Sequence, residues 1–333
     1  MFTRKLGKSG MEVSALGMGC WAIGGPWTFD RGDGERYAAG WGKIDDQESI
    51  RAIHAGLELG INFFDTAANY GAGHSERILA KALEGKRQDV VIATKFGYLV
   101  DEEEKNILND HDAVLENIRK DCENSLRRLN TDTIDLYQFH VGDYPPEKAD
   151  AVRDVLEELV KEGLIRWYGW STDNAEGARV FAKGMHCAAI QQAVHWATQL
   201  DYGPTLQVCE ESNLASIIRG PLGMGLLTGK FKHGDPKLPD DDIRHNWDFN
   251  EGRIADYIQM VEDLREVLTS DGRTLAQGAL GWLWARSEAT VPIPGFKSVE
   301  QVEENAGAMA FGPLKPDQMR EIDRLLGREN PEE

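Results

Sequence analysis

The chain alternates short apolar runs with longer segments in which apolar residues recur every three to four positions. The short runs are rich in β-branched and aromatic residues, which favours strands over helices. We predict strands at residues 14–19, 61–66, 89–95, 133–140, 164–171, 188–194, 214–220 and 290–295. The longer segments predict amphipathic helices at residues 46–60, 113–129, 148–163, 274–287 and 299–310.

The order of these elements predicts the fold class. Strand and helix alternate, and strands that are apolar on both faces are typical of parallel sheets covered by helices. Eight such units in 333 residues fit an α/β fold of the (β/α)8 TIM-barrel type better than an open doubly wound sheet. We therefore expect one domain over residues 1–333, opened by a β-hairpin that turns at Ser9-Gly10 and covers the barrel floor.

Two regions interrupt the alternation of strands and helices. Residues 24–44 are rich in glycine and aromatic side chains, and residues 223–250 run from "GMGLLTGKF" to "WDFN". Long irregular loops in a compact domain are usually lids or binding loops. We expect both regions to lie at the C-terminal face of the barrel and to restrict access to its mouth.

The composition narrows the function classes. The formal net charge of −19 argues against nucleic acid as a partner, because phosphates require clustered Lys and Arg side chains. We interpret the acidic runs at residues 101–104 and 239–242 as solvated surface. The N-terminus has no apolar stretch typical of a signal peptide, and no apolar run is long enough to cross a membrane.

The cysteine pattern predicts a reducing compartment. Cys20, Cys122, Cys187 and Cys209 are scattered and form no C-x-x-C pair. We therefore expect reduced thiols, a cytoplasmic location and no metal site. Expected partners are small molecules rather than nucleic acid or a membrane, and the oligomeric state is left open.

Polar side chains stand at the ends of three consecutive predicted strands. Asp65 ends the second strand, Lys95 the third and His140 the fourth, and Tyr70 lies in the loop after Asp65. Catalytic residues of TIM barrels lie at these C-terminal strand ends. We expect an ion pair between Asp65 and Lys95 and a hydrogen bond between Lys95 and Tyr70. An adjacent ammonium should lower the pKa of the Tyr70 phenol.

Each of these residues alone also has a structural explanation. A strand-end ion pair is often only structural, and a single histidine after an apolar strand is more often a core residue than a catalyst. Together, Asp65, Tyr70, Lys95 and His140 provide a proton donor and acceptor for a carbonyl or carbinol oxygen. Such a site lacks a source of electrons, so redox chemistry would need a bound hydride donor.

Several segments resemble the aldo-keto reductase superfamily. The motifs are "FFDTAANYG", "VIATKFG" and "IDLYQFH", in the family's order and at its typical spacing. The resemblance runs from "ALGMGCWAIGG" to "IPGFKSVEQVEENAGA" and so covers nearly the whole chain. Because "GHSE" follows Tyr70, the chain is most similar to the bacterial branch that includes inositol-operon and general-stress reductases.

The resemblance implies an oxidoreductase that interconverts a carbonyl and an alcohol with NADP(H) or NAD(H). Tyr70 would be the general acid or base, Lys95 held by Asp65 would tune it, and His140 would orient the substrate oxygen. The implied cofactor contacts are Gly19, Cys20, Trp21, Asp65, Ser171, Thr172, Gln192, Arg219, Gly220, Pro221, Leu222, Gly223, Gly225, Leu226, Thr228, Lys230, Gly295, Phe296, Lys297, Ser298, Gln301, Glu304 and Asn305.

Three positions depart from the family's usual residues. Thr172 stands where Asn is usual and keeps only part of its hydrogen-bonding capacity. Gln301 replaces an arginine that is common in NADP-preferring members. Since Lys297 and Ser298 could still hold a 2′-phosphate, we expect NADPH to be preferred, with NADH as the alternative. Arg219 stands where an aromatic residue usually stacks on the nicotinamide, and it could stack or engage a substrate hydroxyl or carboxylate.

The substrate class follows only in outline. An aldehyde, ketone, sugar or cyclic polyol would fit a pocket built from Trp21, Trp27, Tyr70, His140, Trp196 and Trp247. One alternative is a barrel aldolase or lyase in which Lys95 forms a Schiff base. Another is a regulatory subunit that holds a cofactor, since the superfamily includes potassium-channel β-subunits.

Overall fold

The computed structural model describes residues 2–197 and 203–328. The barrel strands are β3 (Met18–Gly19), β6 (Phe63–Asp65), β7 (Val91–Phe96), β10 (Ile134–Phe139), β11 (Ile165–Ser171), β12 (Cys187–Ala193), β13 (Ala215–Arg219) and β14 (Thr290–Pro292). The helices are α1 (Asp46–Glu58), α2 (His74–Ala82), α3 (Val114–Leu129), α4 (Ala149–Lys161), α5 (Ala175–Ala182), α6 (Gly203–Glu211), α7 (Gly252–Asp263), α8 (Arg265–Leu268), α9 (Leu275–Arg286), α10 (Val299–Phe311) and α11 (Pro316–Leu325).

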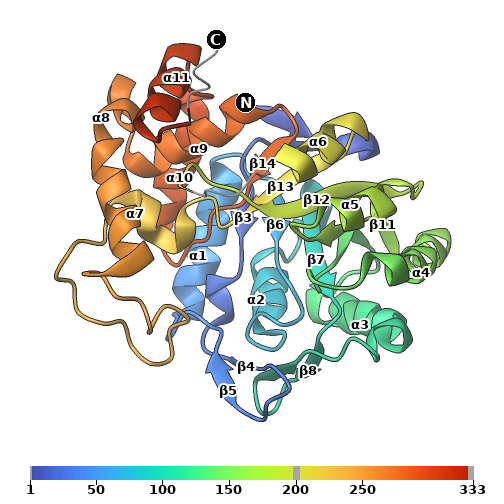
Figure 1. Cartoon of the computed structure of the whole chain (residues 1–333). Coiled ribbons are helices and arrows are strands. Elements are labelled where there is room, and N and C mark those ends of the chain that lie inside the picture. The colour runs from blue at the N-terminus through green and yellow to red at the C-terminus, as the bar shows by residue number, and fades with distance from the viewer. Residues whose placement is uncertain (1, 198–202, 329–333) are drawn as a thin grey trace.

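The eight barrel strands form one parallel sheet that curls on itself (Figure 1). Their order is β14-β13-β12-β11-β10-β7-β6-β3, and a parallel bridge between Gly19 and Gly295 connects the two ends of the sheet. The helices surround this sheet in Figure 1. The predicted (β/α)8 barrel is confirmed, and each predicted strand overlaps an observed one, although β7 ends one residue later and β12 begins one residue earlier than predicted.

The predicted helices are also confirmed, with ends that differ by one or two residues. Helix α1 begins after Asp45, whose carboxylate accepts hydrogen bonds from the backbone N–H groups of Gln47 and Glu48. Six further helices were not predicted from the periodicity: α2, α5, α6, α7, α8 and α11. Most of these helices are short, and short helices depend on tertiary packing rather than on a long local pattern.

The hairpin at the N-terminus covers the barrel floor, as predicted. Strands β1 (Thr3–Lys5) and β2 (Glu12–Ser14) pair antiparallel. The backbone at Gly7, with φ +51°, lies against the first residues of two barrel strands, where a Cβ would come 2.3 Å from the Ala188 carbonyl oxygen. Leu6 and Val13 are fully buried in the apolar cluster that fills the barrel interior. The hairpin therefore closes the interior from below.

The prediction that residues 24–44 are irregular is wrong. They contain β4 (Thr28–Asp30) and β5 (Arg36–Ala38), which join β8 (Leu99–Asp101) and β9 (Asn106–Leu108) in a second sheet of order β5-β4-β9-β8. An isolated two-stranded hairpin is only marginally stable, so β4 and β5 depend on strands that follow β7 much later in the chain. This second sheet lies at one edge of the barrel, at the bottom of Figure 1.

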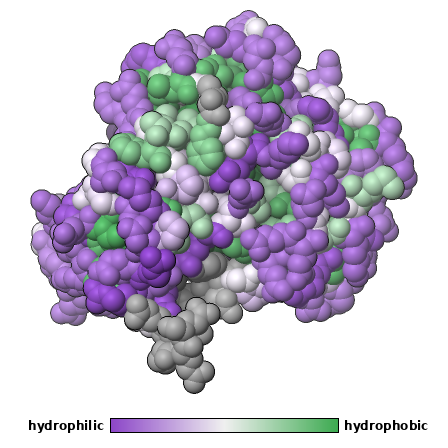
Figure 2. Space-filling model, turned by 90° about the horizontal axis from the view of Figure 1, so that it is seen from above, coloured by the Kyte–Doolittle hydropathy of each residue, from purple (hydrophilic) through white to green (hydrophobic). Residues whose placement is uncertain are grey.

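The surface agrees with the acidic composition. Figure 2 shows one face covered mainly by hydrophilic residues, with hydrophobic residues in separate patches. All four cysteines are buried free thiols. Among the described residues, none of the helices is long and apolar enough to span a bilayer.

The packing at Gly7 gives a stability prediction. In Gly7→Ala, the new methyl group would collide with backbone atoms of two barrel strands at a left-handed residue, so we expect a loss of roughly 2–4 kcal/mol in the free energy of unfolding. Gly10→Ala is the matched control, because Gly10 has φ +67° but no atom within 4 Å of the Cβ position. It should cost only about 1 kcal/mol. Urea unfolding measures both, and equal losses would contradict the proposed contact of Gly7 with the barrel floor.

Candidate active site

A buried ion pair lies at the C-terminal ends of β6 and β7. The Lys95 ammonium donates to Asp65 Oδ1 at 2.5 Å and to the Thr66 carbonyl oxygen at 2.8 Å. Lys95 is 0% exposed and Asp65 is 2% exposed. Each charge therefore compensates the other in a place where neither could remain alone. The predicted pairing of the two side chains is confirmed.

The same ammonium also reaches Tyr70. Lys95 Nζ donates to the Tyr70 hydroxyl at 3.2 Å, as predicted. The loop that carries Tyr70 is fixed by close backbone packing: Gly71 has φ +62°, and a Cβ there would lie 2.0 Å from the Gly24 carbonyl oxygen. Because Gly24 and Gly71 both lack a side chain, the loop after β3 can pack directly against the loop that carries Tyr70.

His140 lies directly after β10, with its ring 5.9 Å from the Tyr70 ring in an edge-to-face arrangement. Its backbone N–H donates to the Phe96 carbonyl oxygen at 2.8 Å. The Tyr98 ring also packs against His140, at 5.4 Å between ring centroids. Tyr98 was not predicted as a site residue, although it lies two residues after the end of β7.

The protonation states follow from burial and neighbouring charge. Burial raises the pKa of Tyr70, and Lys95 offsets this only in part, so the net direction is opposite to the one expected from the ammonium alone. Burial also opposes the charge of Lys95, but Asp65 and Tyr70 together raise its pKa. Burial, followed by the charges of Lys95 and Arg219, holds the pKa of His140 well below its usual range. At neutral pH the site therefore contains a phenol, an ammonium and a neutral imidazole.

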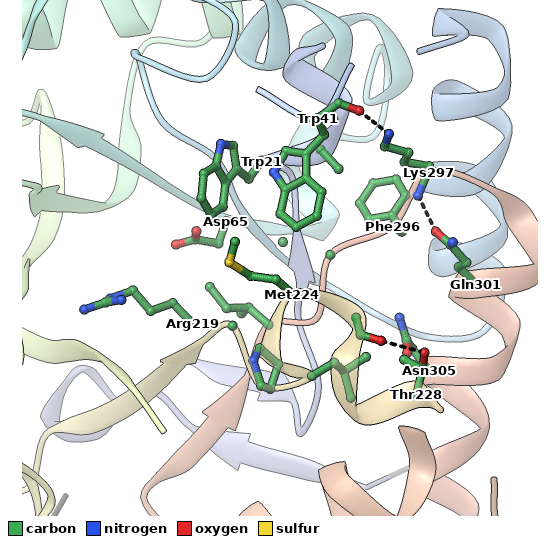
Figure 3. A pocket seen from close by; sticks show the side chains of 18 of the residues that line it. Trp21, Trp41, Asp65, Arg219, Met224, Thr228, Phe296, Lys297, Gln301 and Asn305 are labelled. Atoms are coloured by element: carbon green, nitrogen blue, oxygen red, sulfur yellow. Dashed lines mark hydrogen bonds between the residues drawn. The ribbon is translucent and has the colours of Figure 1, made fainter. Parts of the chain in front are cut away.

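A cavity of about 450 Å³ opens beside this cluster (Figure 3). Asp65 and Arg219 lie at one end of it, whereas Lys297, Gln301 and Asn305 lie at the other. The predicted residues that line it are Gly19, Trp21, Asp65, Tyr70, Arg219, Gly220, Pro221, Leu222, Gly225, Thr228, Lys230, Gly295, Phe296, Lys297, Gln301, Glu304 and Asn305. Among the described residues, no group of acidic, histidine or cysteine side chains could hold a metal ion.

Three cationic side chains line the far end of the cavity. They are Lys230, Arg244 and Lys297, and Asp242 pairs with Arg244 at 2.7 Å. Burial and the two neighbouring cations lower the pKa of Lys230. Burial is also the main reason why the pKa of Lys297 is lowered. Cations held this close together are typical of a site for a multiply charged anion such as a phosphate group.

The backbone beside these cations has an unusual conformation. Gly220, Gly223, Met224 and Gly225 all have positive φ values. Glycine accepts positive φ values without a steric penalty, and its missing side chain lets a ligand approach the backbone closely. The Gly223 N–H donates to the Gly220 carbonyl oxygen and the Gly225 N–H to the Leu222 carbonyl oxygen, both at 2.9 Å, so tight turns determine the shape of this loop, and its contact with a pyrophosphate stays a prediction.

Residues from the two long loops meet above the cavity. Trp41 and Asp242 form an antiparallel bridge, Ile243 N–H donates to the Gly40 carbonyl oxygen at 2.8 Å, and Lys297 donates to the Trp41 carbonyl oxygen. The Arg244 guanidinium lies 4.5 Å from the centre of the Trp41 ring. These contacts join the two loops beside the cavity, which Trp41 and Arg244 both line, whereas restricted access to the mouth stays a prediction.

Several predicted cofactor contacts do not line the cavity. Thr172 Oγ1 donates to the Gly142 carbonyl oxygen at 2.7 Å, and Gln192 donates to Ser216 Oγ at 2.7 Å. Ser298 caps α10 by accepting from Gln301 N–H. The remaining predicted contacts that lie outside the lining are Cys20, Ser171, Gly223 and Leu226.

The structure corrects part of the predicted substrate pocket. Trp196 is 0% exposed in the hydrophobic core, and Trp247 packs against Phe231 at 5.8 Å, so neither lines the cavity. Trp27 is buried in an apolar cluster with Tyr70. Large aromatic residues contribute most when fully buried, which sequence position alone does not reveal. Trp21 does line the cavity and stacks on Tyr70 at 5.9 Å.

Arg219 has a partner that the sequence analysis did not consider. Its guanidinium donates to Asp173, whose other carboxylate oxygen accepts from Ala193 N–H at 2.7 Å. Asp173 therefore links the ends of β11, β12 and β13 at the mouth. Figure 3 shows Arg219 directed away from the other labelled side chains.

Other cavity residues were missed: Ala22, Trp41, Gln191, Met224, Arg244 and Ile293. One signal for Arg244 was present, because it is a cation inside a long loop that was already assigned to ligand binding. No comparable signal distinguished Gln191 from the adjacent Gln192.

Comparison with known proteins identifies the family. Residues 15–326 match the aldo/keto reductase family. The chain belongs to this family. It is 32% identical over 322 residues to the aldo-keto reductase YhdN of Bacillus subtilis. The aligned region covers 96% of this chain and 91% of the relative.

Solved structures of aldo-keto reductases have the same fold. AKR11C1 from Bacillus halodurans, in its holo form, superposes with a TM-score of 0.77 at 29% identity over 100% of this chain and 99% of the other. The glycerol dehydrogenase AKR11B4 from Gluconobacter oxydans gives 0.79 at 29% identity over 99% and 97%. An aldo-keto reductase from Klebsiella pneumoniae in complex with NADP and acetate gives 0.70 at 26% identity over 99% and 97%.

The buried ion pair predicts a coupled effect on stability. Lys95→Met would leave Asp65 buried without its cation, so we expect a loss of about 3–5 kcal/mol in the free energy of unfolding. Adding Asp65→Asn should recover part of this loss, because the remaining amide carries no net charge. A double-mutant cycle by urea denaturation measures the coupling, and additive losses would show that the pair does not act as a unit.

Proposed function

We propose that this protein is an NADP(H)-dependent oxidoreductase that interconverts a carbonyl compound and an alcohol. The observation that carries the proposal is the hydrogen-bonded sequence Asp65–Lys95–Tyr70, which ends in a cavity shared with a distant group of cations. A proton donor at one end and an anion site at the other suit a carbonyl substrate and a phosphorylated hydride donor.

In this proposal Tyr70 exchanges the proton. The bound nicotinamide cofactor supplies or accepts the hydride. Because burial raises its pKa, the Tyr70 phenol remains protonated at neutral pH and can donate to a carbonyl oxygen. The Lys95 ammonium, 3.2 Å away, stabilises the negative charge that develops on the phenol oxygen, and Asp65 holds the ammonium in place.

His140 has a positioning role in this proposal. With its pKa well below neutral, the imidazole is uncharged and can donate one N–H to the substrate oxygen without competing with Tyr70 as an acid. Its edge-to-face contact with Tyr70 holds the His140 ring beside the proposed proton donor, although His140, unlike Tyr70, is not among the residues that line the cavity.

The cations at the far end of the cavity support NADP(H) rather than NAD(H). Lys297 was the one cation expected near the 2′-phosphate, and the same cavity is also lined by Lys230, a predicted cofactor contact, and by Arg244, which was not predicted. Gln301 accepts from the Lys297 backbone N–H at 2.7 Å, so it anchors this loop although it carries no charge. Glu304 and Asn305 line the same end and would face the adenine. The Klebsiella pneumoniae relatives in complex with NADP and with NADPH are consistent with this preference.

We propose an aldehyde, ketone, sugar or polyol as the substrate. Trp21, stacked on Tyr70, offers an aromatic surface beside the proton donor, which suits the apolar face of a sugar or polyol. The similarity to a glycerol dehydrogenase supports the same substrate classes.

The geometry disfavours Lys95 as a Schiff-base nucleophile. That chemistry needs a neutral amine, whereas Asp65 and Tyr70 raise the pKa of Lys95 against the effect of burial. The three hydrogen bonds that the ammonium makes leave it no free position for attack. No contact in the described residues favours a purely regulatory role.

Two further proposals concern the chain as a whole. We propose that residues 1–333 form one domain, because the first and last strands of the barrel sheet are joined by the bridge between Gly19 and Gly295. We also propose a cytoplasmic location, which agrees with four unpaired thiols.

The role of Tyr70 is tested by removing one oxygen atom. Tyr70→Phe should lower kcat for carbonyl reduction by at least about a thousandfold, because it removes the proton donor and leaves the ring packing intact. The affinity for NADPH, measured by quenching of tryptophan fluorescence, should change less than about twofold. A mutant that keeps most of its activity would show that Tyr70 is not the general acid.

The cation site is tested by comparing the two cofactors. Arg244→Gln and Lys297→Met should each weaken NADPH binding by about tenfold or more, while NADH affinity changes little, because only NADPH carries the 2′-phosphate. Lys232→Met, in the same loop but outside the cavity lining, is the control and should bind both cofactors normally. Equal losses for both cofactors would place the cations at the pyrophosphate instead.

A further inference from the structure

The Asp65 carboxylate accepts hydrogen bonds from two side-chain amides that have no role in the chemistry above. Gln138 on β10 and Gln191 on β12 donate from Nε2 to Asp65 Oδ2 at 3.0 Å and 2.8 Å. Lys95 occupies the other oxygen, Oδ1. Gln138 is 0% exposed and Gln191 is 1% exposed, so neither amide can be satisfied by bulk water.

The orientation of both amides is determined by the network. Gln191 Nε2 also lies 3.3 Å from Gln138 Oε1 and donates to it. A reversed Gln138 amide would place its carbonyl oxygen against the Asp65 carboxylate, and two acceptors without a proton would repel each other. Each amide therefore presents N–H groups to Asp65 oxygen Oδ2.

The barrel interior makes these two amides unusual. Leu136 and Ala189 stand two residues earlier on the same strands and belong to the apolar cluster that fills the barrel. Apolar side chains at positions 138 and 191 would continue that cluster, and a buried amide without a partner is costly. The two glutamines therefore form a polar layer between the apolar interior and the ion pair.

We propose that Gln138 and Gln191 are positioning residues that hold Asp65 so that the Lys95 ammonium remains within reach of Tyr70. This inference rests on the proposed function. Of the three hydrogen bonds that the Lys95 ammonium donates, the one to the Tyr70 hydroxyl is the longest, at 3.2 Å. Without the amides, Oδ2 of Asp65 would lack donors, and the ammonium would be drawn toward it and away from the tyrosine.

The groups that face Tyr70 determine the sign of the effect. Burial and Asp65 raise the pKa of Tyr70, whereas Lys95 and Arg219 lower it. The His140 ring faces Tyr70 but is neutral, and the Tyr98 ring packs against His140. Removing the amides leaves the Asp65 charge less compensated and weakens the contact with Lys95. Both changes raise the pKa of Tyr70, so this phenol becomes a weaker acid.

The experiment uses Gln138→Met and Gln191→Met in the full chain, since methionine keeps the length and approximate volume of glutamine without its amide. The pH profile of kcat is measured for aldehyde reduction with NADPH and for the reverse oxidation. Reduction falls, and oxidation rises, as Tyr70 loses its proton. The midpoints of the two pH profiles should both move to higher pH, by about 0.5 to 1 pH unit. In addition, kcat for reduction at neutral pH should fall about threefold. NADPH affinity should change less than about twofold in Gln138→Met, because Gln138 lies outside the cavity lining.

Gln318→Met is the matched control, because this buried amide donates to Ser270 Oγ and Asp271 far from the barrel mouth. It should lower the urea midpoint without moving the pH profile. If Gln138→Met does not fold, Gln191→Met carries the same prediction alone. Unchanged or lowered midpoints would overturn the inference, whereas wild-type protein without any carbonyl reduction would instead overturn the proposed function.

Discussion

The candidate active site depends on one buried ion pair, between Asp65 and Lys95. Two opposite charges can remain in a dry barrel mouth only when each offsets the desolvation of the other and the remaining hydrogen-bonding positions are filled. The Thr66 carbonyl oxygen, the Tyr70 hydroxyl and two glutamine amides fill them here. The position of the proposed proton donor is therefore a consequence of charge compensation, not only of the loop that carries it.

A second group of charges lies at the other end of the cavity and is held differently. Lys230, Arg244 and Lys297 come from loops and from the segment before α10, and they are held by contacts between those loops rather than by strands. These three cations are grouped together although the whole chain has a formal net charge of −19. A positive site within an acidic surface concentrates an anionic ligand at one place and discourages polyanions elsewhere.

The two insertions show how distant segments cooperate. Residues 24–44 follow the first barrel strand and residues 97–108 follow the third, yet they share one sheet. Phe29 of β4 packs against Tyr98, and Tyr98 packs against His140. The second sheet therefore supports the His140 side of the site, while Trp41 in the same insertion contacts Arg244 at the cation end.

The sequence by itself determined the barrel, its order of strands and the meeting of Asp65, Tyr70, Lys95 and His140. These followed because parallel topology brings consecutive strand ends to one rim, so a polar residue after an apolar run has a predictable place. Only the tertiary structure decided which of the adjacent Gln191 and Gln192 faces the cavity, since neighbouring residues on a strand point to opposite sides.

Tertiary structure also decided that Arg219 pairs with Asp173, that Trp196 lies in the core and that Arg244 lines the cavity. It also reversed the expected direction of the Tyr70 pKa. Local sequence identifies which charges are neighbours along the chain, but burial depends on every segment that packs around a group. The balance between desolvation and charge is therefore a property of the folded molecule.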